Sequence, residues 1–212
     1  MIHQKNYFSH EIQSKVGSLF IEGPITVKQL GQWEFHKDLN TFRPANRQKE
    51  ALKTIIERPE GRIYVARHVN TIVGYVAYVY PDTMERWSKA ELDNLIELGA
   101  IEICPSYRGY SLAKHLIYQS MKDDAMDDYI VISTEYYWHW DLKNTGVTMW
   151  QYRSILERIM NNAGLYEQKT TDPEIASHPV NSLMVRIGSR VDESSIEQFN
   201  KIRLMKTNYK LY

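Results

Sequence analysis

The feature that most constrains this chain is a strand closed by a proline and followed at once by a loop and a helix. A strand is predicted through Ile101–Cys104, and Pro105 ends it because proline has no N–H for a sheet ladder. A helix is predicted over Ser111–Met121, where apolar residues recur at helical spacing. A strand that feeds directly into an amphipathic helix is typical of proteins in which helices pack on a sheet.

Other segments extend the same pattern. Arg62–Arg67 and Ile72–Tyr80 are rich in β-branched and aromatic residues, which predicts an antiparallel hairpin. Further strands are predicted at Ser18–Glu22, Tyr129–Thr134 and Ser182–Ile187, and helices at Val27–Asn40, Arg47–Glu57, within Met84–Glu97, over Tyr152–Ala163 and from Ser194. We expect an α/β (α+β) fold, a mixed central sheet of about six to seven strands flanked by helices. Residues 1–190 are expected to form one domain, with 191–212 as a C-terminal helix and basic tail that packs on it or extends from it.

Charge and cysteine content narrow the class of protein. Lys plus Arg and Asp plus Glu number 26 each among 212 residues, so no global field attracts nucleic acid and no such partner is expected. The basic residues near the C-terminus, Lys201, Arg203, Lys206 and Lys210, are most simply a solvated helix end. A single cysteine allows no internal disulfide, and the chain shows no leader and no apolar run of about 18 residues. We therefore expect a cytoplasmic protein without a membrane partner.

The loop before the second helix is a candidate anion site. A helix start presents backbone N–H groups and a partial positive charge. Gly109, Ser111 and Ala113 are small enough to let an anion approach that backbone, and Arg108 adds a cation. Such a site suits a pyrophosphate, although a plain strand-to-helix connection with a glycine turn fits the same spacing.

The same segment resembles the signature of the GNAT N-acetyltransferases. That signature is Arg or Gln, two residues, Gly, one residue, then Gly or Ala, and here residues 103–113 read ICPSYRGYSLA. Ser111 is the one departure, since the family usually has glycine there. The resemblance implies the GNAT fold and transfer of acetyl from acetyl-CoA to an amine. It also implies that Ile103 and Cys104 hold the pantetheine arm and that the pyrophosphate is held by Arg108, Gly109, Tyr110, Ser111, Leu112 and Ala113.

Runs outside this segment resemble a narrower group, the acetyltransferases of bacilli that serve acetoin utilisation and inactivate acetyl-CoA synthetase. These runs are Ile21–Pro24, Glu34–Leu39, Thr71–Val76, Leu95–Glu102, Thr134–Lys143 and Ser177–Pro179. The resemblance implies a protein lysine acetyltransferase whose partner is acetyl-CoA synthetase. Two alternatives stay open, a GNAT acetyltransferase for a small amine and a non-catalytic, acetyl-CoA-responsive partner that inhibits by docking.

Direct transfer requires a group that accepts the proton of the attacking amine, because a lysine of pKa about 10.4 is neutral in only about one molecule in 2,500 at pH 7. Glu102 and Glu97 are the candidate bases, and Glu102 is slightly favoured because it lies nearer the expected thioester. Their odd separation places them on opposite faces of a regular strand unless a bulge intervenes. The simpler interpretation of each is a solvated strand carboxylate.

The leaving thiolate needs a proton, and the usual donor of the family is missing. Many members use a tyrosine on the late helix, and the corresponding position here is Met160. Tyr152, Tyr136, Tyr137 and His139 are candidate substitutes, and position in the sequence does not choose among them.

No metal site is expected from the sequence. The seven histidines show no ligand spacing with cysteine or with carboxylates. Cys104 lies in an apolar strand, where a cysteine is usually a small core residue, and direct acetyl transfer requires no nucleophile on the enzyme.

Overall fold

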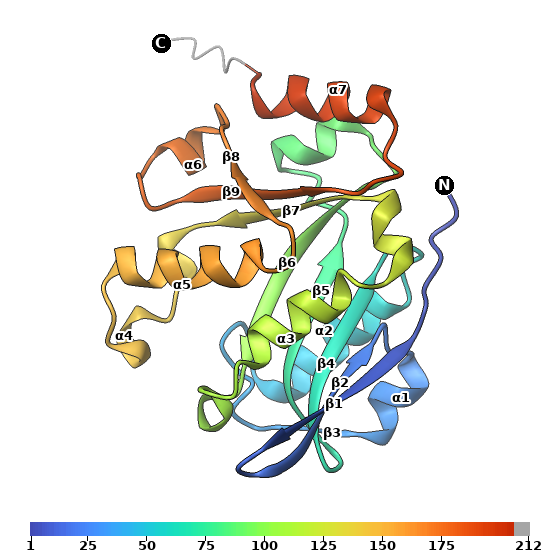
Figure 1. Cartoon of the computed structure of the whole chain (residues 1–212), viewed down its shortest axis with the longest axis vertical. Coiled ribbons are helices and arrows are strands. Elements are labelled where there is room, and N and C mark those ends of the chain that lie inside the picture. The colour runs from blue at the N-terminus through green and yellow to red at the C-terminus, as the bar shows by residue number, and fades with distance from the viewer. Residues whose placement is uncertain (206–212) are drawn as a thin grey trace. The chain divides into compact units, whose positions relative to one another are not determined.

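The structure is a computed structural model that describes residues 1–205, and Figure 1 shows its ribbon. Lys206 and Lys210 of the predicted basic tail lie outside these residues. The chain forms two compact units. Unit 1 contains residues 1–80 and 98–126, and unit 2 contains residues 81–97 and those from 127 onward.

Unit 1 is a sheet covered by helices. Its strands are β1 (Phe8–Ser14), β2 (Gly17–Gly23), β3 (Glu34–Phe35), β4 (Arg62–His68), β5 (Thr71–Val79) and the last residues of β6 (Leu95–Ile103). β1, β2, β4 and β5 are antiparallel neighbours in that order, and β3 runs parallel to β5. Its helices are α1 (Val27–Gln32), α2 (Ala45–Ile56), α3 (Leu112–Ser120) and the short 3-10 helix η2 (Pro105–Tyr107).

The predicted hairpin of β4 and β5 forms the centre of unit 1. All residues from Arg62 to Ala66 are buried, so this strand needs cover on both of its faces. α2 and α3 both pack against β4 and β5 and lie on opposite faces of these strands (Figure 1). The hairpin therefore gives unit 1 a core on each side of its sheet.

Unit 2 contains the remaining strands and helices. The first residues of β6 pair in parallel with β7 (Ile130–Glu135), which is antiparallel to β9 (Ser182–Ile187), and β9 is antiparallel to β8 (Tyr166–Gln168). The helices are α4 (Leu142–Thr145), α5 (Met149–Asn161), α6 (Pro173–Ala176) and α7 (Glu193–Arg203). Short 3-10 helices lie at η1 (Arg86–Ala90) and η4 (Tyr137–His139), while η3 (Asp124–Asp128) spans the boundary of the two units along the chain.

In the core of unit 2, the last helix, α7, packs against the first segment of the unit, which contains η1. The rings of Trp87 and Phe199 from these two elements are 6.2 Å apart. Ile130, Ile132 and Leu183 from the strands belong to the same buried cluster. Among the described residues, no helix has the length and apolar character that crossing a bilayer requires.

Parallel and antiparallel pairs coexist, which confirms the predicted mixed sheet with helices. The described residues contain nine strands, more than expected, because β1, β3 and β8 were not predicted. β3 has only two residues and β8 three, and strands this short carry no alternating pattern.

Several predicted helices differ from the observed ones in their bounds or their type. The helix predicted at Val27–Asn40 ends at Gln32, because the next residues pair with β5 as β3. The helix predicted within Met84–Glu97 is only the 3-10 turn η1, and the apolar residues after it form β6. α7 begins one residue before Ser194, because Asp192 caps it by accepting the Ser195 N–H at 2.9 Å.

The predicted late helix forms as α5, but most side chains of its predicted apolar stripe are not buried. Of the helix residues only Met160 is buried, and the Ile155 side chain is 46% exposed. The helix also begins earlier than predicted, because Thr148 and Gln151 form a capping box.

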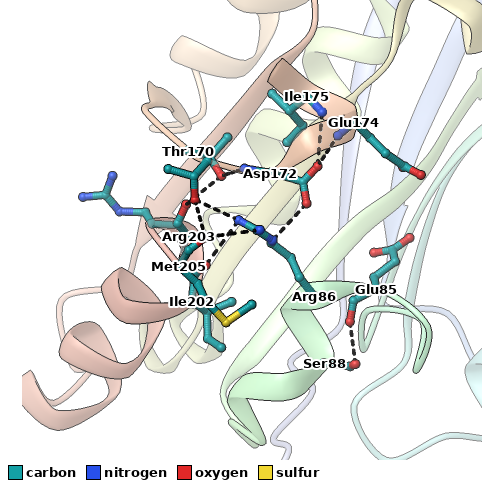
Figure 2. Close-up of polar contacts among 11 residues, drawn as sticks. Glu85, Arg86, Ser88, Thr170, Asp172, Glu174, Ile175, Ile202, Arg203 and Met205 are labelled. Atoms are coloured by element: carbon teal, nitrogen blue, oxygen red, sulfur yellow. Dashed lines mark hydrogen bonds and ion pairs between the residues drawn. The ribbon is translucent and has the colours of Figure 1, made fainter. Parts of the chain in front are cut away.

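A buried ion pair ties η1 to α6 and to the end of α7 (Figure 2). Arg86 Nε lies 3.1 Å from Asp172 Oδ2, and the two side chains are 6% and 10% exposed. The other guanidinium nitrogens donate to the Thr171 hydroxyl at 3.2 Å and to the carbonyls of Ile202 and Met205 at 3.5 Å. Asp172 also caps α6, since its Oδ1 accepts the N–H groups of the first turn.

Arg86→Met should lower the free energy of unfolding by about 3–5 kcal/mol, because it leaves the Asp172 carboxylate buried without its cation. The measurement is urea unfolding followed by circular dichroism. The matched control is Arg190→Met, whose partner Asp128 and whose own side chain are 37% and 42% exposed, so its loss should stay below about 1 kcal/mol. Equal losses in both variants would contradict this account of the fold.

Candidate functional site

The loop between β6 and α3 has an unusual backbone. Gly109 has φ +95° and Ser111 has φ +57°, and both values lie in the left-handed region. This conformation costs a residue other than glycine about 1–2 kcal/mol. The fold of unit 1 therefore holds Ser111 in a conformation that its side chain disfavours.

That backbone leaves the start of α3 without a side-chain cap. Ser111 is the N-cap residue, and its hydroxyl makes no capping hydrogen bond. The first N–H to bond within the helix is that of His115, which donates to the Ser111 carbonyl at 3.0 Å. The N–H groups of Leu112, Ala113 and Lys114 precede that bond, as in any helix start. A Cβ added at Gly109 would meet no atom within 4 Å, so space beside the loop is open. Uncapped amides next to open space and to Arg108 fit the pyrophosphate that the sequence predicts here.

The end of β6 is held against β5 just before this loop. Cys104 donates its N–H to the Val73 carbonyl at 2.9 Å, and its own carbonyl accepts the Tyr107 N–H at 2.8 Å. Gly74 permits the approach, because a Cβ there would lie 2.6 Å from the Ile103 side chain. The backbone N–H and carbonyl of Cys104, predicted to hold pantetheine, are thus already bonded within unit 1.

Glu102 is a buried, fully bonded carboxylate. It is 5% exposed. Its Oε1 accepts the Thr41 N–H at 2.7 Å, and its Oε2 accepts the Tyr75 hydroxyl at 2.7 Å. Burial, together with this neighbouring carboxylate, raises the pKa of Tyr75, so Tyr75 stays a donor. Glu102 therefore ties the segment after β3 to the sheet of unit 1.

Glu97 has a different environment in unit 2. It is 8% exposed, and its Oε1 accepts the Thr134 hydroxyl at 2.6 Å. Burial raises the pKa of Glu97, and the carboxylates of Glu135 and Asp82 raise it further. A carboxylate with a raised pKa is a stronger base than an ordinary surface glutamate.

Other carboxylates in unit 2 share this environment. Burial raises the pKa of Glu135, whose oxygens accept Ser133 Oγ at 2.8 Å and Trp140 Nε1 at 3.3 Å. Burial and then the carboxylate of Glu97 raise the pKa of Glu85 to about 7. One buried oxygen of Glu85 has no hydrogen-bond partner among residues 1–205. This group of carboxylates favours cations and protons.

The candidate proton donors are aromatic neighbours in unit 2. Tyr136 is buried, burial raises its pKa, and its ring stacks on Trp138 at 4.8 Å. The ring of His139 lies 5.7 Å from that of Tyr136, and Tyr152 stacks on Trp140 at 5.2 Å. Tyr137 instead packs against His178, with ring centres 4.5 Å apart. The predicted aromatic residues thus gather in unit 2, and Met160 is buried where the family usually has its acid.

Sequence reasoning missed two groups of residues. Thr134 contacts Glu97 from the neighbouring parallel strand, and the local sequence pattern does not reveal the register of two strands. His36 contacts Cys104 although the two are 68 positions apart in the chain. Only the parallel pairing of β3 with β5 could have indicated that contact, and β3 is too short to predict.

Comparisons with known proteins identify the family of this chain. Residues 32–144 match the model of the acetyltransferase (GNAT) family. The chain is 54% identical over 203 residues to the acetoin utilization proteins AcuA of Bacillus licheniformis and of Bacillus subtilis, which covers 96% of this chain and 97% of each relative. It is also similar to the crystal structure of an acetoin utilization protein from Exiguobacterium sibiricum, with 44% identity, a TM-score of 0.91 and 95% of both chains covered.

The chain therefore belongs to the GNAT family of acetyltransferases. This confirms the family that residues 103–113 predict, together with its fold and with acetyltransferase activity. The family uses acetyl-CoA as its donor. The resemblance to the acetoin-utilisation group of bacilli is confirmed by the two Bacillus relatives. The roles of the individual residues remain predictions.

Ser111→Gly should keep the free energy of unfolding within about 1 kcal/mol and retain coenzyme A binding, because glycine adopts the left-handed conformation without strain. Ser111→Val should weaken coenzyme A binding roughly tenfold, because a β-branched residue disfavours this conformation by about 1–2 kcal/mol. Isothermal titration calorimetry with coenzyme A measures both variants. Equal affinity of the glycine and valine variants would show that the left-handed backbone is not needed for binding.

Proposed function

We propose that this protein transfers the acetyl group of acetyl-CoA to a lysine of acetyl-CoA synthetase and so inactivates that enzyme in the cytoplasm, in acetoin and acetate metabolism. The observation that carries the proposal is the near full-length similarity to proteins named for acetoin utilization. The aromatic run Thr134–Lys143 and the other runs of the sequence add the resemblance to enzymes that act on the synthetase. Acetylation removes the charge of a lysine and its ammonium donor geometry, which suits the inactivation of an enzyme that uses it.

The donor site of this proposal is the loop between β6 and α3. The Arg108 guanidinium and the uncapped N–H groups of Leu112 and Ala113 hold the pyrophosphate, and the backbone at Ile103 holds the pantetheine arm. Acetyl-CoA supplies a thioester carbonyl that an amine attacks. The left-handed residues Gly109 and Ser111 keep the amides of the loop directed at the anion.

We assign the proton-accepting role to Glu97 rather than to Glu102. Both oxygens of Glu102 already accept hydrogen bonds, from Thr41 and Tyr75, so a new proton there would disrupt a structural contact. Glu97 accepts the Thr134 hydroxyl and is also hydrogen-bonded by the Thr134 backbone, and its raised pKa makes it a stronger base than an ordinary glutamate. This reverses the slight preference that chain position alone gives.

The neighbours of Glu97 suit a cationic substrate. Asp82, Glu85 and Glu135 are carboxylates that raise its pKa or share its burial, and a lysine ammonium is attracted to such a group. The proton for the coenzyme A thiolate comes, in this proposal, from Tyr152 or His139, which take the place of the tyrosine that Met160 replaces.

The test is incubation with acetyl-CoA labelled in its acetyl group and with purified acetyl-CoA synthetase. The proposal predicts label on a lysine of the synthetase and loss of synthetase activity in proportion to the label. Label that enters small amines and not the synthetase would favour the small-amine acetyltransferase. A tight complex without label transfer would favour inhibition by docking and would contradict the proposal.

Glu97→Gln should lower kcat by about 10²- to 10⁴-fold at saturating acetyl-CoA, because it removes the proton acceptor. Glu102→Gln is the matched control. It should lower the melting temperature, since it perturbs the bonds to Thr41 and Tyr75, and should reduce kcat much less. Full activity of Glu97→Gln, beside an inactive but folded Glu102→Gln, would reverse the assignment.

The raised pKa of Glu97 also predicts how stability depends on pH. A carboxyl whose pKa is higher in the folded state than the ordinary 4.5 binds its proton more tightly when folded. It therefore contributes stability that is complete below about 4.5 and is lost as the pH rises through the folded pKa. Glu97→Gln should thus gain stability relative to the wild type as the pH rises from about 4 to 8. Melting temperatures across that range check this, and a constant difference would refute the pKa shift.

A further inference from the structure

A cluster of sulfur, nitrogen and oxygen atoms in unit 1 has no role in the proposed acetyl transfer. Cys104 Sγ lies 3.2 Å from His36 Nδ1, and His36 Nδ1 lies 3.9 Å from Asp38 Oδ2. The ligand atoms of the three residues all lie within 4.8 Å of one another. His36 and Asp38 come from the segment after β3, and Cys104 comes from the end of β6.

The spacing of these atoms fits a tetrahedral zinc ion. Zinc binds thiolate sulfur at about 2.3 Å and nitrogen or oxygen at about 2.0–2.2 Å, so tetrahedral ligand atoms lie roughly 3.4–3.6 Å apart. The observed separations of 3.2 and 3.9 Å lie on either side of that range. The remaining pair, Cys104 Sγ and an Asp38 carboxylate oxygen, lies within 4.8 Å, and rotation of the exposed Asp38 side chain would bring that oxygen to bonding distance. The cysteine and histidine donors select zinc over magnesium or calcium, which prefer oxygen ligands.

The fold fixes two of the three ligands before any ion binds. Cys104 is fully buried and is held by its backbone bonds to Val73 and Tyr107. His36 donates its N–H to the Ile72 carbonyl at 3.1 Å, and its ring packs edge-on against the Tyr107 ring at 6.2 Å. The side chain of Asp38 is 47% exposed, so the cluster opens to solvent on that side. The buried thiol of Cys104 would hold the ion inside unit 1, and the exposed Asp38 side chain would let the ion enter from solvent.

The hydrogen bonds within the cluster show which contacts a bound ion would replace. The Asp38 N–H donates to His36 Nδ1 at 3.2 Å, which places the ring proton on Nε2 and a lone pair on Nδ1. Cys104 Sγ lies 3.2 Å from that lone pair and 3.1 Å from Ser106 Oγ. Binding of the ion releases the thiol proton of Cys104 to solvent, and Nδ1 exchanges the Asp38 N–H for the metal. No electron is transferred in this step.

We propose that His36, Asp38 and Cys104 bind one zinc ion, with water in the fourth position. The ion joins the segment after β3 to the end of β6, a junction that Glu102 also makes through the Thr41 N–H. This replaces the expectation of no metal, which looked for ligands close together in sequence. The inference is independent of the proposed acetylation of acetyl-CoA synthetase, because none of the three ligand side chains takes part in the proposed transfer.

The experiment uses cobalt(II) as a spectroscopic probe of the untagged full-length protein. The proposal predicts one equivalent of tightly bound cobalt, with sulfur-to-cobalt charge-transfer absorption in the near ultraviolet, four-coordinate bands in the visible and displacement by zinc. Cys104→Ser should abolish the charge-transfer absorption, and His36→Gln should weaken cobalt binding at least about tenfold. The matched control His10→Gln, on the exposed strand β1, should bind as the wild type does.

The variants at the buried ligands could fail to fold, so Asp38→Asn is measured as well. Because Asp38 is exposed, this variant is expected to fold. It should keep the charge-transfer absorption and weaken cobalt binding at least about tenfold. Wild-type protein without charge-transfer absorption, or a Cys104→Ser variant that keeps it, would overturn the site. Unchanged affinity in Asp38→Asn would overturn the three-ligand assignment.

Discussion

The left-handed backbone at Gly109 and Ser111 is the constraint on which the site in unit 1 depends. It turns the chain from the end of β6 into α3 so that the first amides of the helix receive no side-chain cap. The strain at Ser111 is tolerated because the preceding residues are fixed, with Cys104 bonded to β5 and Gly74 allowing close approach of Ile103. The contacts between β5 and the end of β6 thus fix where the loop begins.

Environment, rather than residue type, separates the two candidate bases. Glu102 and Glu97 are both buried glutamates of β6, but one is bonded through both oxygens to its own unit and the other lies among carboxylates. The same carboxylates that raise the pKa of Glu97 favour the approach of a cationic amine.

Much of the fold follows from local patterns, and the exceptions have physical reasons. Ser182–Ile187 was predicted with its observed bounds, and β4 and β5 to within one residue at either end, because their β-branched and aromatic runs are bounded by turns. The helix predicted within Met84–Glu97 did not form as an α-helix, because the residues at the end of this segment pair with β7 as part of β6. The loop at 108–113 was predictable from its signature, whereas the Glu97–Thr134 contact and the His36–Cys104 contact depend on strand pairing between distant segments. Periodicity shows which residues prefer a buried face, but it does not show which element covers them, as the exposed Ile155 of α5 illustrates.

The central claim is that the backbone of the β6–α3 loop binds the pyrophosphate of the acetyl donor. Hydrogen–deuterium exchange of the backbone amides, measured with and without saturating coenzyme A, tests it directly. The account predicts slower exchange at Gly109–Lys114, with little change in α7. Coenzyme A that binds with full affinity while exchange at Gly109–Lys114 stays the same would contradict it.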